Sequence, residues 1–334
     1  MGHDIARLHH VGHVVGNMGE ALTLYRRLGF AVPPPSCPTM APAEGAEPEP
    51  FGAANTHADF RRSFIELATC VRDGDATRIP EDAHLVPLQA PASQLPLLLE
   101  RIGETSAELA VMLSRFEGLP ILMFSSPDID ATATRLASAG VGHGGVNAVR
   151  RPVETSSGIR TELVRYLEID SDGPGTGTGT GNGSTAEGRV GAVADLDADI
   201  QGSRLLDHPN GAVDLTEVVL CVAEAELALV QARYENYLGR PARADGPVRA
   251  FDLDGAALTL VPDTHLTALL PDERPAALPA FVAYAVAVRD LAVVRDLLEE
   301  EGIPLRESPS GDVFVPAAAA LGTEIVFRQA PVPA

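Results

Sequence analysis

Lysine and tryptophan are absent from this chain, and aromatic residues make up only 4% of it. All 25 basic side chains are therefore arginines. Without lysine the protein has no side-chain amine for a Schiff base and no lysine to hold phosphate in a P-loop. Cysteine is scarce too: Cys37, Cys70 and Cys221 form no CxxC motif, which is typical of a reducing compartment and not of a disulfide framework.

Positive charge is outweighed nearly two to one, because 46 acidic residues give a net charge of -21. No basic stripe is available for nucleic-acid phosphates, and an anionic membrane would repel the chain. No stretch approaches 18 consecutive apolar residues, and the N-terminus lacks the apolar run of a signal peptide. We therefore expect a cytoplasmic protein that acts on a small molecule, as a monomer or homodimer, and binds neither nucleic acid nor membranes.

Residues 171–188 alternate glycine and threonine and have almost nothing to bury, which predicts a flexible linker. A phosphate-binding glycine loop is the alternative, but such a loop needs a preceding strand and a following helix. A length of 334 residues fits two domains. We expect an N-terminal domain over 1–170, a linker over 171–188 and a C-terminal domain over 189–334.

One pattern occurs four times: an apolar strand, a polar turn residue, an amphipathic helix and a glycine that ends the helix. The pairs of turn residue and glycine are Asn17 and Gly29, Asp128 and Gly140, Glu224 and Gly239, and Asp290 and Gly302. The third pair is about one helical turn further apart than the others, which predicts a longer helix there. Strand-like segments follow each helix. The pattern predicts an α+β protein with four βαβββ modules, of which those at 5–70 and 119–170 are joined by an extra helix at 92–117.

The segment Leu8-His9-His10-Val11-Gly12-His13-Val14-Val15, followed by a helix and Leu28-Gly29-Phe30, resembles the vicinal oxygen chelate superfamily. Its members include glyoxalase I, extradiol dioxygenases and bleomycin resistance proteins, and the fourfold repeat strengthens the resemblance. Within it the chain is similar to two-domain glyoxalase-like proteins of bacteria. The resemblance implies two cup-shaped domains, each built from two modules, with a divalent metal ion on the floor of a cup.

The resemblance also implies where the metal ligands lie. The first-strand ligand matches His10, the last-strand ligand of the first module matches Glu66, and that of the second module matches Glu168. Glu162 is a rival on the strand of Glu168. The remaining first-strand position falls on Ile121, which cannot bind a metal, so a ring-cleaving dioxygenase is less expected than an isomerase or lyase.

The residues themselves also favour a metal site, because six of the nine histidines lie in the first 84 residues. Imidazoles clustered with carboxylates suit Fe, Mn, Ni or Zn. If Phe60 and Ser63 close a two-residue hairpin, His57 lies directly opposite Glu66 on the same face. We expect His57 and Glu66 to transfer protons, and His13 and Asn55 to line the substrate pocket. Each of these side chains could instead be an ordinary half-buried strand residue.

Two functions follow from these observations. The first is a metal-dependent enzyme, an isomerase or lyase acting on a small oxygen-rich molecule. The alternative is a metal-free protein that sequesters a small molecule such as an antibiotic. The C-terminal domain is expected to be structural, because its first-strand positions fall on Glu217 and Ala283 and its last strands place apolar residues where a carboxylate is needed.

Overall fold

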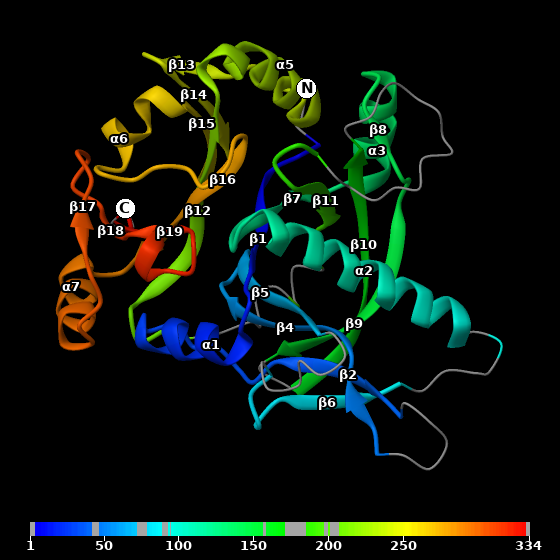
Figure 1. Cartoon of the computed structure of the whole chain (residues 1–334). Coiled ribbons are helices and arrows are strands. Elements are labelled where there is room, and N and C mark those ends of the chain that lie inside the picture. The colour runs from blue at the N-terminus through cyan, green and yellow to red at the C-terminus, as the bar shows by residue number, and fades with distance from the viewer. Residues whose placement is uncertain are drawn as a thin grey trace.

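The computed structural model describes residues 4–41, 47–71, 79–88, 93, 95–155, 158–170, 185–196, 200 and 207–331. These residues form two mixed β-sheets, which lie side by side in Figure 1. The first has the strand order β3-β2-β4-β5-β1-β7-β11-β10-β8, with β6 beside β2 and β9 beside β10. Its strands are β1 (Arg7–Val14), β2 (Ser36–Met40), β3 (Glu49–Pro50), β4 (Gly52–Asp59), β5 (Phe64–Val71), β6 (His84–Pro87), β7 (Gly118–Ser126), β8 (Gly142–His143), β9 (Asn147–Thr155), β10 (Gly158–Asp170) and β11 (Arg189–Ala194).

The second sheet has the order β13-β14-β15-β12-β16-β19-β18-β17. Its strands are β12 (Ala212–Val222), β13 (Arg243–Asp245), β14 (Val248–Leu253), β15 (Ala256–Pro262), β16 (Ala280–Val288), β17 (Arg306–Glu307), β18 (Val313–Val315) and β19 (Glu324–Gln329). The helices are α1 (Met18–Arg27), α2 (Leu95–Arg115), α3 (Ile129–Ser138), α5 (Leu227–Leu238), α6 (Leu266–Leu269) and α7 (Leu291–Glu300).

Four βαβββ modules are present, as the repeat predicted. In each module the first and last strands are neighbours and parallel: β1 with β5, β7 with β11, β12 with β15 and β16 with β19. The first strands of paired modules run antiparallel, β1 beside β7 and β12 beside β16. The predicted α+β class is therefore confirmed.

The helix boundaries follow from local chemistry. The side chain of Asn17 accepts hydrogen bonds from the backbone N–H groups of Gly19 and Glu20 at the start of α1. Gly29 follows the helix with a φ of 78°, a left-handed conformation that glycine adopts without steric cost. The extra residues of the third module form a 3₁₀ turn at Glu224–Glu226 that leads into α5. The predicted extra turn is thus present, in the tighter form.

The boundary between the two sheets differs from the predicted one. β11, which follows the glycine- and threonine-rich segment, pairs with both β7 and β10 in the first sheet. The second sheet begins with β12, so the change of sheet falls between residues 194 and 212. Residues 171–184 lie outside the described part of the chain. A long loop inside one sheet and a linker between domains have the same composition, because neither buries apolar side chains.

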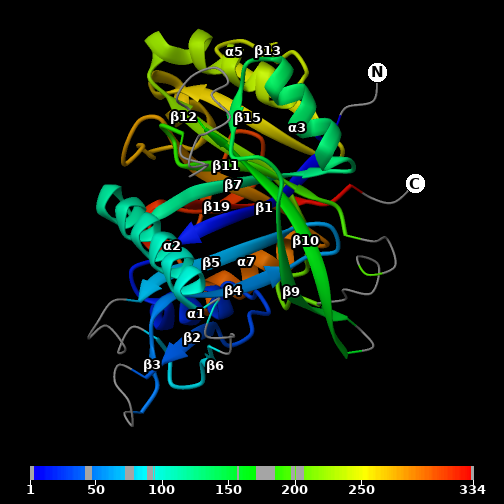
Figure 2. The ribbon, with the colours of Figure 1, turned by 90° about the vertical axis from the view of Figure 1, so that its right-hand side faces the viewer.

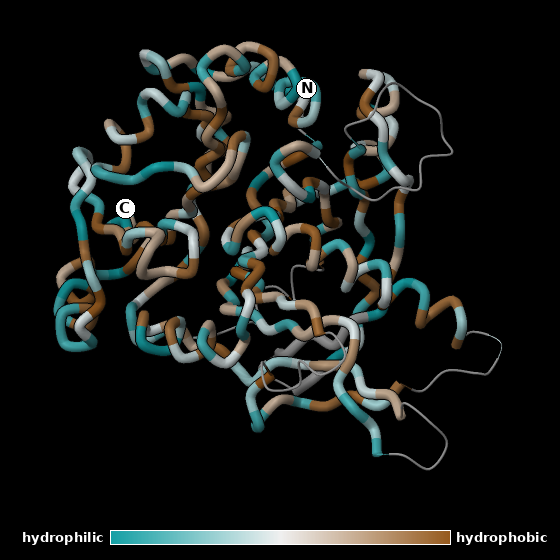
Figure 3. Tube along the Cα trace, in the orientation of Figure 1, coloured by the Kyte–Doolittle hydropathy of each residue, from teal (hydrophilic) through white to brown (hydrophobic). Residues whose placement is uncertain are grey.

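One apolar core joins the two halves. Helices α1 and α3 cover one face of the first sheet, and the same hydrophobic cluster continues into the second sheet and α5. Phe30, after α1, stacks on Phe327 of β19 with ring centroids 6.0 Å apart. Figure 3 shows hydrophobic residues concentrated along the central strands, and β7 and β16 are buried over their full length. Burial at this density provides the main stabilisation of the two-sheet arrangement.

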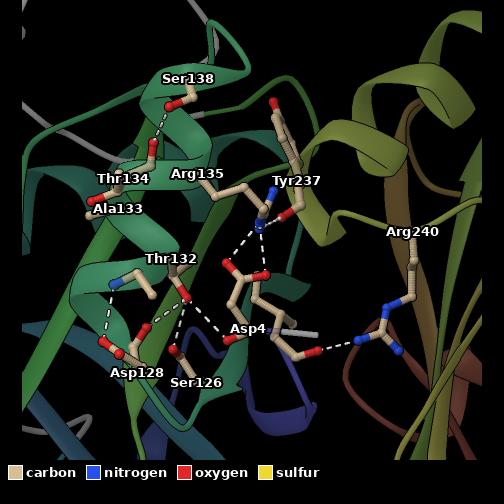
Figure 4. A network of polar contacts seen from close by, with 12 residues as sticks. Asp4, Ser126, Asp128, Thr132, Ala133, Thr134, Arg135, Ser138, Tyr237 and Arg240 are labelled. Atoms are coloured by element: carbon tan, nitrogen blue, oxygen red, sulfur yellow. Dashed lines mark hydrogen bonds and ion pairs between the residues drawn. The ribbon is translucent and has the colours of Figure 1, made fainter. Parts of the chain in front are cut away.

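Polar contacts also cross between the halves. Arg135 of α3 donates to the carboxylate of Asp4 at 2.7 Å and to the backbone carbonyls of Asn236 and Tyr237, at the end of α5 (Figure 4). Arg240 reaches back to the carbonyl oxygen of Ile5. The N-terminal segment, the second module and the third module are therefore held together at one point.

The predicted extra helix is α2, which lies across the face of the first sheet opposite α1 and α3 (Figure 2). Its Leu109 packs with Val14, Ala68 and Ile121 on that face. We call this face, with α2 over part of it, the first cup, and the corresponding face of the second sheet the second cup. No helix in the described ranges is long and apolar enough to span a membrane.

Candidate functional site

The first cup collects most of the residues predicted for the site. β5 carries Glu66, and the antiparallel neighbour β4 places His57 directly opposite it, as the hairpin geometry predicted. Phe60 and Ser63 close that hairpin through a backbone hydrogen bond of 2.8 Å. His57 Nε2 lies 3.8 Å from Glu66 Oε1, and Asn55, also on β4, donates to the same oxygen at 2.9 Å.

His10 lies beside this group on β1. Its ring stacks on Phe64 with centroids 4.4 Å apart, and Phe64 in turn contacts His57 at 4.6 Å. Nδ1 of His10 is 2.7 Å from Nδ1 of His9, so one of these nitrogens carries the proton of a shared hydrogen bond. His10, Glu66, His57 and Asn55 are therefore brought together at one end of the first cup.

The first cup contains a second charged group. Its central residue, Arg189, was not predicted from the sequence. Arg189, the first residue of β11, donates to the carboxylate of Glu168 on β10, with Nε at 2.6 Å. Glu108 reaches the same guanidinium from α2, at 4.0 Å. The Glu168 side chain is only 8% exposed and that of Arg189 22% exposed, so this ion pair is largely withdrawn from water.

Electrostatics ties these groups into one cluster. Burial alone would lower the pKa of Arg189, but the carboxylates of Glu168, Glu108 and Glu66 outweigh that effect and raise it. The pKa of Glu108 is raised by burial, an effect that the charge of Arg189 partly offsets. Arg189 is therefore a permanent cation surrounded by three carboxyl groups in the first cup.

Glu168 is not on the last strand of its module, contrary to the prediction. β10 was taken for the last strand because residues 189–194 were assigned to the C-terminal domain, whereas the last strand, parallel to β7, is β11. In the first module Gly12 lies five residues before the cap residue Asn17 and pairs with Glu66. In the second module the residue five before the cap Asp128 is Met123, which pairs with Gly191, so Gly191 matches Glu66. A Cβ atom on Gly191 would lie 2.3 Å from the carbonyl oxygen of Leu167, so no carboxylate fits there.

His13 does not line the cup. It is fully buried on the opposite face, where Nδ1 hydrogen-bonds with the hydroxyl of Tyr25 and Nε2 lies 2.9 Å from the carbonyl oxygen of Leu321. The Tyr25 hydroxyl continues to that of Tyr284 in the second sheet. Burial lowers the pKa of His13 to about 4, so the ring is neutral and belongs to the contact between the two halves. Glu162 pairs with Arg160 on its own strand.

The predicted metal ligands can be tested against this arrangement. Among the described side chains, no three of the His, Cys, Asp and Glu type converge as a metal site requires. Glu168 is bound by Arg189, Glu66 accepts a hydrogen bond from Asn55, and His10 stacks on Phe64. A guanidinium thus stands among the carboxylates where a divalent cation would be expected, and the donors as placed do not fit a metal ion.

In the second cup, too, an arginine lies among carboxylates, but the residues are different. Glu217, at the first-strand position of the third module, accepts hydrogen bonds from Thr259 and from Arg328, the latter at 2.9 Å. Arg328 also pairs with Asp312 at 2.9 Å. No histidine is among the partners of Glu217 in the described contacts. The cluster is fully hydrogen-bonded and faces apolar residues such as Phe314.

Arg189 was missed because the expected domain boundary placed it in the other half of the chain. The signal was present in the sequence: residues 189–194 read Arg-Val-Gly-Ala-Val-Ala, a short strand-like run directly after the Gly/Thr segment. Assigning that run to the first sheet would have completed the second module and brought Arg189 into the cup.

Two sheets, each made of two βαβββ modules with a polar centre on the face opposite the module helices α1, α3, α5 and α7, define a protein of the vicinal oxygen chelate class. The model of the glyoxalase-like domain family matches residues 8–238, and the chain belongs to that family. No curated protein matches the chain.

Solved structures share the fold. A hypothetical protein from Staphylococcus aureus aligns with a TM-score of 0.56 and 8% identity, over 98% of this chain and 100% of that one. A mutant of 4-hydroxymandelate synthase from Streptomyces coelicolor aligns with a TM-score of 0.53 and 14% identity, over 99% of this chain and 95% of that one. At these identities the likeness extends to the architecture alone.

Proposed function

We propose that this chain is a metal-independent, small-molecule-binding member of the glyoxalase-like family, with its binding site in the first cup. The observation that supports the proposal is the position of the Arg189 guanidinium. It forms an ion pair with Glu168 and interacts electrostatically with Glu108 and Glu66. A fixed cation in this position supplies the charge that a metal ion would otherwise supply. The charge of one carboxylate, that of Glu168, is then balanced without a metal.

The ligand we propose is a small molecule that carries an amine or another positive group. Three carboxyl groups, on Glu66, Glu108 and Glu168, surround one guanidinium, so the site attracts positive charge. Glu66 and His57 retain 15% and 30% side-chain exposure, which leaves them reachable from solvent. Phe64 lies next to the carboxylate, with the ring of His10 stacked on it and that of His57 tilted against it, and such rings attract a cation.

Glu66 and His57 are also the groups we propose for proton transfer, should the bound molecule react. They lie on adjacent strands, and their separation of 3.8 Å allows a proton to pass through a shared contact with a ligand. Asn55 orients Glu66 by donating to Oε1. In this proposal Asn55 is a positioning residue.

The metal-dependent isomerase or lyase remains the second candidate, because His10 and Glu66 do share one cup. It requires Arg189 to release Glu168. The Arg189→Met variant examines this directly: removal of the guanidinium leaves the carboxylates unbalanced, so we expect the variant to bind added Ni²⁺ or Zn²⁺ more tightly than the wild type.

The experiment that tests the proposal is calorimetric titration of the chelator-treated protein with phenethylamine and spermidine as cationic probes. We expect binding without added metal, and a loss of about tenfold or more in the Glu66→Gln variant, because a charge-assisted contact disappears. Glu217→Gln in the second cup is the matched control and should bind like the wild type. Binding that appears only after metal is restored, or an unaffected Glu66→Gln variant, would contradict the proposal.

A further inference from the structure

A cavity of about 330 Å³ lies between the two halves of the molecule, at the edge of the second cup, whose apolar residues Ala280 and Val282 line it. Phe116 and Glu117, which connect α2 to β7, form one wall. The beginnings of β16 and β19, with the short segment Ala317–Ala319, form the other. The volume is within the range of small-molecule sites, at its lower end, and most of the lining is alanine, phenylalanine, valine and leucine.

One carboxyl group in this cavity is neutral. Glu324, the first residue of β19, lines the cavity and is 1% exposed. Its burial raises its pKa to about 9, and the neighbouring carboxylate of Glu273 acts in the same direction. Glu273 accepts a hydrogen bond from Nη1 of Arg306. At neutral pH Glu324 therefore presents a polar but uncharged group to the cavity.

The other two ionisable groups in the lining differ in how they are satisfied. Glu117 Oε1 accepts a hydrogen bond of 2.7 Å from the backbone N–H of Gly16, so this carboxylate already has a structural partner. Arg274 is exposed at the edge of the cavity, and within the described part of the chain it has no acidic partner or hydrogen bond. Arg274 is therefore the cation in the lining that is available to a ligand.

We propose that this cavity binds a small monocarboxylate with an apolar body. The carboxylate pairs with Arg274 at the edge, where a guanidinium offers two parallel donors. The apolar body lies against Phe116, Phe281 and the alanines of residues 317–319.

This site is separate from the first cup, so the proposal goes beyond the proposed function and does not depend on it. Its walls come from both halves of the chain. A ligand that contacts both walls stabilises their association, because it binds the folded two-half arrangement and not the unfolded chain. Ligand binding should therefore raise the unfolding temperature of the whole protein.

The test uses the full chain, with phenylacetate and hexanoate as probes and phenylacetamide as the uncharged counterpart, followed by calorimetry and thermal unfolding. We expect at least one of the two carboxylates to bind with one site per chain and to raise the unfolding temperature. The amide should bind about tenfold or more weakly. Arg274→Gln should weaken the carboxylate to the level of the amide, and Ala318→Phe should block it by filling the cavity.

Arg295→Gln is the matched control, because Arg295 is a partly exposed arginine that pairs with Glu307 away from the cavity. It should leave the affinity unchanged. Failure of both carboxylates to bind at millimolar concentration would overturn the proposal. So would equal affinity in the wild type and Arg274→Gln, since binding would then be elsewhere.

The pH profile gives a second readout. The groups packed around Glu324 are Glu273, which is paired with Arg306, and Cys221, whose thiol has its pKa raised by burial to about 12. Raising the pH through about 9 ionises Glu324 and should weaken carboxylate binding by repulsion. Glu324→Gln stays neutral and should keep its affinity over the same range. A wild-type affinity that does not change with pH would overturn the assignment of Glu324 to this site.

Discussion

The two cups share one scaffold and carry an arginine among carboxylates on the same strand of the module, yet they use different positions. In the first cup Arg189 lies two residues before Gly191, the last-strand position that matches Glu66. In the second cup Arg328 lies two residues after the corresponding Val326. Because side chains alternate along a strand, both positions face into the cup. Relative to the last-strand position that Glu66 occupies in the first module, the arginine of the first cup therefore lies on the N-terminal side and that of the second cup on the C-terminal side.

The surroundings of the two arginines differ in a way that separates a binding site from a structural cluster. The second cup has Thr259 donating to Glu217, and Arg328 bridging Glu217 and Asp312, so its polar groups satisfy one another. The first cup places His57 beside Phe64, and His57 Nε2 is buried there without a hydrogen-bond partner among the described residues. We therefore assign ligand binding to the first cup.

The largest expected effect concerns the assignment of strands to the two cups. A protease site inserted within residues 171–184 allows the chain to be cut between β10 and β11. We expect the two fragments to stay together on size-exclusion chromatography under native conditions, because β11 is hydrogen-bonded to both β7 and β10. Separation of the fragments without denaturant would contradict the assignment of β11 to the first sheet.

The two arginines should differ in their contribution to stability. Arg189→Met leaves the nearly buried Glu168 without its partner and should lower the free energy of unfolding by about 3 kcal/mol. Arg328→Met should cost about 1 kcal/mol, because Arg328 is 38% exposed and water screens its contacts. Urea unfolding of both variants measures the difference. Equal losses would mean that the two clusters are equivalent.

Acid should weaken the contact between the halves through His13. Its pKa is lowered to about 4 in the folded protein by burial, whereas the unfolded chain has the ordinary value of 6.5. Between these values the unfolded state takes up a proton that the folded state does not, so stability falls as the pH drops from about 6.5 to about 4. The expected contribution is about 3 kcal/mol.

The second half offers the control for this acid effect, because Leu220 occupies the position that matches His13. In a His13→Leu variant, the number of protons taken up on unfolding in this pH range, which the slope of the unfolding free energy against pH reports, should fall by nearly one. Chemical denaturation at several pH values between these limits measures the slope. An unchanged slope would show that His13 is not the group that titrates.

The smallest expected difference lies at the helix caps. Asn17→Ala removes the side-chain acceptor at the start of α1 and should cost about 1 kcal/mol. Glu226→Ala, at the start of α5, should have almost no effect, because Glu226 makes no side-chain capping hydrogen bond. Thermal unfolding of the two variants compares them. A larger loss in Glu226→Ala would contradict the capping assignment.

The sequence predicted the modules well because each repeat carries its own local signals. The cap at Asn17, the glycine after each helix and the alternation along β4 and β5 are encoded by neighbouring residues, and so is the pairing of His57 with Glu66. The side of a strand that faces the cup is harder to predict. His13 was expected to line the pocket, but β1 is irregular between Leu8 and His10 and again between Gly12 and Val14. Those irregularities result from tertiary packing.

The centre of the first cup could not be predicted from local pattern, because its three parts are distant in the sequence. Glu108 comes from α2, Glu168 from β10 and Arg189 from a strand that follows the Gly/Thr segment. Their meeting depends on the placement of β11 between β7 and β10, which is a long-range property of the sheet. The family resemblance pointed to Glu168 as a last-strand metal ligand, whereas the structure places it on β10 and pairs it with Arg189.

The most direct test of the account is the metal content of the purified wild-type chain, measured by elemental mass spectrometry after equilibration with Fe, Mn, Ni and Zn and removal of the free ions. A cup in which Arg189 balances the charge of Glu168 should retain far less than one metal ion per chain. The Arg189→Met variant should retain more. One tightly held ion per wild-type chain, lost in His10→Ala or Glu66→Gln, would contradict the account and restore the metal-dependent enzyme.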